Sequence, residues 1–335
     1  MASGIIRIGI LGSGAMAATH AAAYADMAGV QLAGVFGRDP ARLARFAERC
    51  GAAPVSDMAG LLDDSSLDAI DVCLPSANHP EAVIAALGKG KHVFCETPMA
   101  LRLDDAGRMR DAARQAGRLL QVGLLMRSVG PYAHLQAAAV SGAHGRLLGF
   151  TAWRLGSYLR PGNADHKPHY SEPSTELMTF DFDVAQWLMG RPVKLMASAV
   201  RTMAGGAGEI TALLAYDDGR HATVIASGLM PRGAAFSVGC RALFEAAAFE
   251  LQTVFADGPP RNQFTIVTDD APPRPVAVPQ ANPYQLELQR FVDCIHGRAD
   301  PQLLDAERAI EALVLSTATQ RSLAEGRAID IASVG

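Results

Sequence analysis

The sequence predicts an α/β protein in which a doubly wound parallel sheet precedes an α+β domain with a large open, mostly antiparallel sheet. Two patterns support this fold class. Short apolar runs alternate with helical segments from residue 5 to about 125, which is typical of a parallel sheet covered by helices. Longer strand-like runs with few helices follow, and 335 residues exceed the usual size of one domain. We therefore predict domains over residues 1–125 and 126–335.

The first half contains five apolar runs that fit buried strands, separated by helical segments. The expected strands are Ile5–Leu11, Gln31–Phe36, Ala69–Leu74, His92–Cys95 and Leu119–Val122. The expected helices lie near residues 15–27, 40–50, 78–88 and 103–116. This alternation predicts a parallel, doubly wound sheet.

The second half begins with a helix near Tyr132–Ser141 and continues as runs rich in β-branched and aromatic residues. The expected strands are Leu147–Arg154, Lys194–Thr202, Ile210–Tyr216, His221–Leu229, Phe236–Cys240, Ala242–Leu251 and Phe264–Thr268. Gly219 fits the turn of a hairpin. A proline-rich connection over Ala271–Pro283 precedes two closing helices, near Tyr284–His296 and Asp305–Glu325.

Composition and charge narrow the classes of function. The formal net charge is -4, the pI is near 6.1 and no block of Lys and Arg occurs, so nucleic acid is not expected as a partner. The five cysteines have neither close pairs nor zinc-like spacing, which predicts reduced core residues and no metal site. No leader-like start and no membrane-length apolar run is evident, so we expect a cytoplasmic protein.

A glycine-rich segment follows the first strand directly and leads into a helix. It reads Gly12-Ser13-Gly14-Ala15-Met16-Ala17 and fits the pattern G-x-G-x-x-A. The first glycine allows a tight turn, the second lets the backbone approach a pyrophosphate, and the alanine keeps the helix close to the strand. The N-terminus of the helix then faces the phosphates with unpaired N–H groups. This context predicts a Rossmann domain that binds a dinucleotide.

The end of the second strand indicates which dinucleotide binds. An acid there binds the ribose hydroxyls of NAD and repels the 2′-phosphate of NADP. This chain instead has Gly37 followed by Arg38, with Arg42 one helical turn further on. Because arginine can clamp a phosphate with two hydrogen bonds, NADP is favoured, with NAD as the other possibility. The alternative is that Asp39 caps a helix and the arginines are solvated.

Four further segments carry a recognisable combination of motifs: Leu74–His79, Gly90–Ala100, Phe180–Gly190 and Pro283–Val292. Together they resemble the glucose-fructose oxidoreductase / inositol dehydrogenase / MocA family, over nearly the whole chain. The resemblance implies a Rossmann domain, a second domain with a large open sheet, and NAD or NADP between them. It also implies a homo-dimer or homo-tetramer built through that sheet, and small substrates such as sugars, polyols and related cyclic compounds.

The expected cofactor contacts come from the glycine-rich turn and from the ends of neighbouring strands. The resemblance places Asn78 and His79 at the edge of the cofactor, although His79 could equally cap the next helix, and places Glu96 near the nicotinamide ribose. The full set of expected cofactor residues is Gly12, Ser13, Gly14, Ala15, Met16, Gly37, Arg38, Arg42, Leu74, Pro75, Ser76, Asn78, His79, Glu96 and Thr97.

The chain departs from the catalytic pattern of the family at two positions. Thr97 stands where the family has the lysine of a Glu-Lys-Pro motif, and threonine has no proton that titrates near neutral pH. The family's Asp, His and Asp on one helix correspond here to Glu176, Phe180 and Asp183. Their spacing predicts one stripe along a helix, with an inert ring at its centre.

Another group must then transfer the proton. The polar loop over residues 163–170 leads into the same helix, and His169 and Tyr170 are chemically suited to the task, although a solvated loop or an oligomer contact is an equal alternative. We predict an NADP-dependent oxidoreductase that moves a hydride between nicotinamide and a carbonyl or secondary alcohol. The alternatives are an inactive dinucleotide-binding sensor or assembly protein, and a redox-neutral lyase or epimerase. The candidate catalytic residues are Glu176, Asp183, His169, Tyr170 and Thr97.

Overall fold

The computed structural model describes residues 4–160, 173–203, 205–256 and 258–335, which form two compact units. One unit comprises Met1–Ser128 and Ala281–Ile310, and the other comprises Val129–Gln280 and Glu311–Gly335. The first break lies close to the predicted boundary between residues 125 and 126. One boundary is not enough to divide the chain into these units, however, because Ala281–Ile310 belongs to the first unit.

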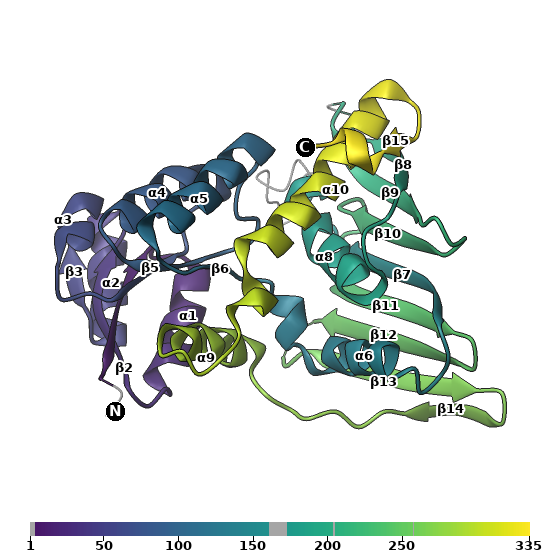
Figure 1. Ribbon diagram of the computed structural model, residues 1–335, viewed down its shortest axis with the longest axis horizontal. Coiled ribbons are helices and arrows are strands. Elements are labelled where there is room, and N and C mark those ends of the chain that lie inside the picture. Colours follow the sequence, from purple (N-terminus) through teal and green to yellow (C-terminus); the bar gives the residue numbers. More distant parts are fainter. Residues whose placement is uncertain (1–3, 161–172, 204, 257) are drawn as a thin grey trace. The chain divides into compact units, whose positions relative to one another are not determined.

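The first unit is built on a six-stranded parallel sheet in the order β3-β2-β1-β4-β5-β6 (Figure 1). This is the strand order of a Rossmann domain, with its reversal between β1 and β4, and it confirms the predicted fold class. The three-residue edge strand β3 was not predicted from the sequence. The strands are β1 (Ile6–Leu11), β2 (Val30–Phe36), β3 (Ala53–Val55), β4 (Ala69–Val72), β5 (His92–Cys95) and β6 (Leu120–Val122).

Helices cover both faces of this sheet. Tyr24, Phe46 and Phe291, from α1, α2 and α9, share one buried core with β1. On the other face α3 packs closely, since a Cβ on Gly9 would lie 3.2 Å from Leu61, and α4 and α5 lie on that side in Figure 1. The helices are α1 (Ala15–Ala25), α2 (Pro40–Cys50), α3 (Met58–Asp63), α4 (His79–Gly88), α5 (Leu103–Ala116) and α9 (Pro283–Ile295).

The second unit is built on a nine-stranded sheet in the order β14-β13-β12-β11-β7-β10-β9-β8-β15. Neighbouring strands are antiparallel except β7 and β10, which confirms the predicted mostly antiparallel sheet. Gly219 has a φ of 84° in the turn between β9 and β10, as a hairpin turn requires. The strands are β7 (Leu147–Leu155), β8 (Lys194–Arg201), β9 (Ala207–Ala215), β10 (His221–Ser227), β11 (Phe236–Phe244), β12 (Ala247–Phe255), β13 (Arg261–Thr268), β14 (Ala271–Pro275) and β15 (Ile329–Asp330).

Three predicted features of this sheet were wrong. The predicted strand Ala242–Leu251 is divided by a turn, because β11 ends at Phe244 and β12 begins at Ala247. The strand β11 continues through Arg241, where a break between two strands was predicted. The Arg241 side chain is exposed and its two neighbours are buried, which is the alternation expected along a strand. The first part of the proline-rich connection forms β14, which pairs with β13 near the end of the sheet. Proline is tolerated there because an edge strand has N–H groups that need no partner in the sheet.

The helices of the second unit lie on one side of its sheet (Figure 1). They are α6 (Gly130–Ser141), α7 (Pro173–Glu176), α8 (Met178–Met189) and the greater part of α10 (Ala306–Glu325). The opposite face exposes apolar side chains on several strands, among them Met196, Leu213, Leu243 and Val267. None of the helices in the described part of the chain is long and apolar enough to cross a membrane.

Candidate active site

The glycine-rich turn joins β1 to α1 at the carboxyl end of the parallel sheet. Gly12 has a φ of 131°, and a Cβ there would lie 2.5 Å from the carbonyl oxygen of Cys73, so only glycine fits. Gly14 is the N-cap of α1, which has no side-chain cap and no acid in its first turn. Among the described residues, a Cβ on Gly14 would meet only the Arg42 guanidinium, at 4.0 Å. The free N–H groups of α1 and the room above Gly14 fit a phosphate group.

Arg42 reaches this turn from the first turn of α2. Its Nε donates to the carbonyl oxygen of Ser13 at 2.8 Å, while its backbone N–H donates to the Asp39 carboxylate at 3.1 Å. The predicted cap of α2 by Asp39 is therefore confirmed, and Arg42 contacts the glycine-rich turn. A Cβ on Gly37 would lie 2.5 Å from Ser13 Oγ, so an acid at this position requires Ser13 to move. Arg38 is exposed beside it.

His79 ties the segment after β4 to the segment after β5. It is 1% exposed, with Nδ1 3.0 Å from the Pro98 carbonyl oxygen and Nε2 2.7 Å from the Leu74 carbonyl oxygen. Burial lowers the pKa of His79, which favours the neutral ring that donates from one nitrogen. His79 thus positions two loops. In the same segment Pro75 and Asn78 are exposed.

Glu96 and Thr97 follow β5 at the same edge of the sheet. Glu96 Oε2 accepts a hydrogen bond from the Thr97 backbone N–H at 3.2 Å, and its side chain is 14% exposed. Thr97 Oγ1 donates to the Gly123 carbonyl oxygen at 2.8 Å, which joins the segments that follow β5 and β6. The hydroxyl proton of Thr97 is therefore bound to the backbone.

Three buried ionisable side chains behind Glu96 were not predicted from the sequence. They are His20 on α1, Asp71 on β4 and Glu287 on α9. We call these three, with Glu96, the buried acid–histidine cluster. A histidine in an alanine-rich helix and an aspartate inside an apolar strand were available signals for two of them. No local signal marks Glu287, because its polar surroundings come from elements distant in the sequence.

In the second unit, Arg154 on β7 binds the start of α8. Its Nε and Nη2 donate to the two carboxylate oxygens of Asp181 at 2.9 Å and 3.1 Å. Burial raises the pKa of Asp181, and the charge of Arg154 opposes this shift. The Arg154 guanidinium carbon lies 4.6 Å from the centre of the Phe180 ring, a distance typical of a cation–π contact.

The predicted single stripe of Glu176, Phe180 and Asp183 does not lie on one continuous helix. α7 ends at Glu176 and α8 begins at Met178, because Leu177 leaves helical geometry with φ −123° and ψ −50° while its side chain is buried. Phe180 and Asp183 share α8, where Phe180 is half-buried and Asp183 is buried. The candidates His169 and Tyr170 lie outside the described residues.

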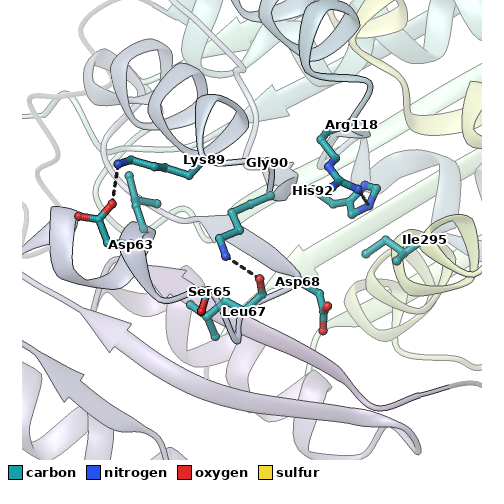
Figure 2. A pocket seen from close by; sticks show the side chains of 11 residues that line it. Asp63, Ser65, Leu67, Asp68, Lys89, Gly90, His92, Arg118 and Ile295 are labelled. Atoms are coloured by element: carbon teal, nitrogen blue, oxygen red, sulfur yellow. Dashed lines mark hydrogen bonds and ion pairs between the residues drawn. The ribbon is translucent and has the colours of Figure 1, made fainter.

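A polar hollow of about 430 Å³ lies at the opposite edge of the parallel sheet, beside the start of β5 (Figure 2). Polar groups that line it contact one another, as Lys89 pairs with Asp63 at 2.6 Å and Arg118 Nη1 lies 3.3 Å from His92 Nε2. Its lining includes none of the predicted site residues that the structure describes. The chemistry predicted from the sequence is therefore not located there.

Two family models match the chain, one over each of its predicted halves. Residues 6–124 match the model described as an oxidoreductase family with an NAD-binding Rossmann fold, and residues 132–248 match the GFO/IDH/MocA C-terminal domain. The chain belongs to the GFO/IDH/MocA family. The resemblance noted in the sequence is thereby confirmed.

Curated relatives of this GFO/IDH/MocA protein include inositol dehydrogenases. Inositol 2-dehydrogenase 2 of Saccharopolyspora erythraea is 34% identical over 195 residues, which cover 56% of this chain and 55% of the relative. The scyllo-inositol 2-dehydrogenase (NAD(+)) of Bacillus subtilis is 22% identical over 338 residues, which cover 97% of this chain and 96% of the relative. The chain spans about half the length of the Saccharopolyspora relative and of the inositol 2-dehydrogenase of Rubrobacter xylanophilus.

Solved structures show the same GFO/IDH/MocA fold. A putative NADPH-dependent oxidoreductase from Desulfitobacterium hafniense has a TM-score of 0.88 and 19% identity, and covers 100% of this chain and 99% of its own. Levoglucosan dehydrogenase in complex with NADH and levoglucosan has a TM-score of 0.80 and 19% identity, with coverage of 97% and 99%.

Proposed function

We propose that this GFO/IDH/MocA protein is an NADP-dependent oxidoreductase. In this proposal it transfers a hydride between nicotinamide and a carbonyl or secondary alcohol of a sugar, polyol or related cyclic substrate. The observation that carries the NADP assignment is the position of Arg42 on the glycine-rich turn, beside Gly37 where an acid would repel a 2′-phosphate.

The first unit offers groups that suit the pyrophosphate, the 2′-phosphate and the nicotinamide half of the cofactor. The N–H groups at the start of α1 would hold the pyrophosphate, and Arg38 and Arg42 would hold the 2′-phosphate. The segment Leu74–Asn78 and Glu96 would border the nicotinamide half, because they follow β4 and β5. When bound, the cofactor supplies or accepts the hydride. The chain binds and orients the reactants and moves the proton.

We assign proton transfer to the acids of the second unit, Glu176 and Asp183, with His169 and Tyr170 as further candidates. As an alcohol is oxidised, its C–H bond breaks and the hydride goes to the nicotinamide. In this proposal one of these two carboxylates accepts the O–H proton. Thr97 is assigned a positioning role, because its hydroxyl donates to the Gly123 carbonyl and does not titrate near neutral pH.

The names of the relatives support a polyhydroxylated substrate. The three curated relatives named above are inositol dehydrogenases, and one solved relative is a levoglucosan dehydrogenase with levoglucosan bound. Since these relatives act on hydroxylated rings, we propose a substrate of that class.

Arg42→Ala tests the cofactor assignment. We expect it to weaken NADP binding by about tenfold or more, because only NADP carries the 2′-phosphate that a charged hydrogen bond would hold, and to change NAD binding much less. Calorimetric titrations of both cofactors measure this. Arg45→Ala, which removes an exposed arginine from the same helix, is the matched control. Equal loss of affinity for NAD and NADP would refute the assignment.

The engaged side chains of Thr97 and Phe180 favour a second candidate function. They occupy the two positions where the family has a proton-transferring lysine and histidine, and they contact Gly123 and Arg154 instead. A dinucleotide-binding sensor or assembly protein without dehydrogenase activity is compatible with this replacement, because neither side chain exchanges a proton near neutral pH. Cofactor binding without turnover of any small substrate would identify it.

A further inference from the structure

The buried acid–histidine cluster lies at the edge of the sheet where ligands of such folds bind, and its role as a ligand neighbour rests on the proposed cofactor binding. Glu96 reaches the surface, with its side chain 14% exposed, whereas His20 and Asp71 are wholly buried. Glu287 is also wholly buried. Glu96 is therefore the point at which the cluster meets the ligand edge.

His20 lies between two carboxylates of the cluster. Its Nδ1 is hydrogen-bonded to Asp71 Oδ2 at 2.8 Å, and its Nε2 makes a 2.7 Å ion-pair contact with Glu96 Oε1 that is not aligned as a hydrogen bond. Burial lowers the pKa of His20, but the neighbouring Asp71 and Cys73 side chains together outweigh this effect and raise it well above its ordinary value. Two carboxylates and one imidazolium leave one net negative charge.

Glu287 adds a carboxyl group to the cluster without adding charge. Polar atoms of His20, Glu96 and Glu287 lie within 4.8 Å of one another, yet neither carboxyl oxygen of Glu287 has a hydrogen-bond partner among the described residues. Burial raises the pKa of Glu287 well above its ordinary value, and the charge of Glu96 raises it further. A carboxyl group in this position keeps its proton at neutral pH.

The neighbouring Tyr24 and Cys73 add no charge either. Burial raises the pKa of the Tyr24 hydroxyl well above its ordinary value, and it also raises that of the Cys73 thiol. Both groups are protonated at neutral pH, so the count of charges rests on the three members that contact one another directly.

We propose that the buried acid–histidine cluster carries one net negative charge at the nicotinamide end of the cofactor site and favours the oxidised cofactor. The strand order places the phosphate-binding turn after β1 and the nicotinamide half at the ends of β4 and β5. The oxidised nicotinamide ring carries a positive charge that the reduced ring lacks. A partly buried charge is screened less than a charge in water. The negative charge of the cluster therefore stabilises the bound oxidised ring relative to the bound reduced ring.

The ratio of two dissociation constants tests this proposal independently of activity. We compare binding of NADPH with binding of NADP by fluorescence and calorimetric titration at pH 7. Glu96→Gln removes the negative charge nearest the surface, and we expect the preference for the oxidised form to fall by about tenfold, the size of effect expected of a partly screened unit charge. A general loosening of the site cancels in the ratio.

Two control variants complete the design. Glu287→Gln replaces a neutral acid by a neutral amide, so we expect the ratio to stay within about twofold of the unchanged protein. Glu48→Gln removes an exposed acid at the end of α2 and is also expected to leave the ratio unchanged. An equal fall in the ratio for Glu287→Gln would overturn the proposed distribution of charge.

An unchanged ratio for Glu96→Gln would overturn the proposal. If this variant does not fold, Glu96→Ala removes the same carboxylate charge and keeps the Asp71–His20 hydrogen bond, and an unchanged ratio would have the same meaning. Where NAD and NADH bind in place of NADP and NADPH, the ratio is measured with that pair. Failure of all four to bind would defeat the proposed function itself, whereas binding with an unchanged ratio would defeat this inference alone.

Discussion

Burial of the Glu287 carboxyl group makes the free energy of unfolding depend on pH. Its pKa in the folded chain is raised by burial and by the charge of Glu96, whereas in the unfolded chain it returns to its ordinary value of 4.5. As pH rises above that value, the unfolded chain releases a proton that the folded chain retains. Stability due to this group therefore decreases with rising pH until the folded group also ionises.

Glu287→Gln is expected to remove this loss of stability. The variant should match the unchanged protein near pH 4.5 and become progressively more stable than it as pH rises, by up to about 1.4 kcal/mol per pH unit. Thermal and urea unfolding at a series of pH values measure the difference. The facing groups His20, Tyr24, Asp71 and Glu96 are kept in both proteins, and Glu48→Gln is expected to show no such trend. A difference that is independent of pH would contradict the account.

The residues of the glycine-rich turn could be predicted from the sequence because their signal is local. Strand, glycines and helix follow one another, and the structure shows the close approach that Gly12 permits. The partner of the Thr97 hydroxyl could not be predicted, because it is the Gly123 carbonyl oxygen, 26 residues away. His20 and Glu287 meet through packing of α1 on α9, which no local pattern reports.

At the scale of elements, one face of the nine-stranded sheet exposes apolar side chains on several strands. Met196 and Leu213 are paired across β8 and β9 and are 41% and 46% exposed. Leu243 and Val267 lie on other strands of the same sheet and are also exposed. Apolar side chains on a sheet face are suited to an interface between copies of a chain, as the predicted homo-dimer or homo-tetramer requires.

Leu213→Asp tests this interface. We expect the unchanged protein to sediment as a dimer or tetramer and the variant to shift toward the monomer, because an interface would bury the new carboxylate without a partner. Analytical ultracentrifugation gives the masses. Val140→Asp, at a position 77% exposed on α6, is the control and should keep the assembly intact. A monomeric unchanged protein would exclude the proposed interface.

Most elements could be predicted from periodicity, and the exceptions have physical reasons. The exposed Arg241 looked like a break, although a charge on the outer face of a strand does not interrupt its hydrogen bonds. The short β3 and α3 are too brief for a periodic pattern to emerge. The interruption at Leu177 carries no signal in the sequence, because the spacing of the polar and apolar residues continues from α7 into α8.

At the scale of the whole molecule, the chain builds two units and returns to the first after leaving it. Ala281–Ile310 joins the first unit because Leu288, Phe291 and Val292 of α9 complete the core beside α1. The sequence predicts this helix but not its assignment, since an amphipathic pattern identifies a buried face and not the surface that it meets. This return also delivers Glu287 to the cofactor-binding unit.

The central claim is that this chain binds NADP and uses it for hydride transfer. The most direct test is a titration of the purified protein with NADP, NADPH, NAD and NADH, followed by a panel of inositols, sugars and polyols monitored at the nicotinamide absorbance. We predict tighter binding of NADP than of NAD, and a change in absorbance with at least one hydroxylated ring. Tighter binding of NAD, or NADP binding without any substrate-dependent absorbance change or product, would contradict this account.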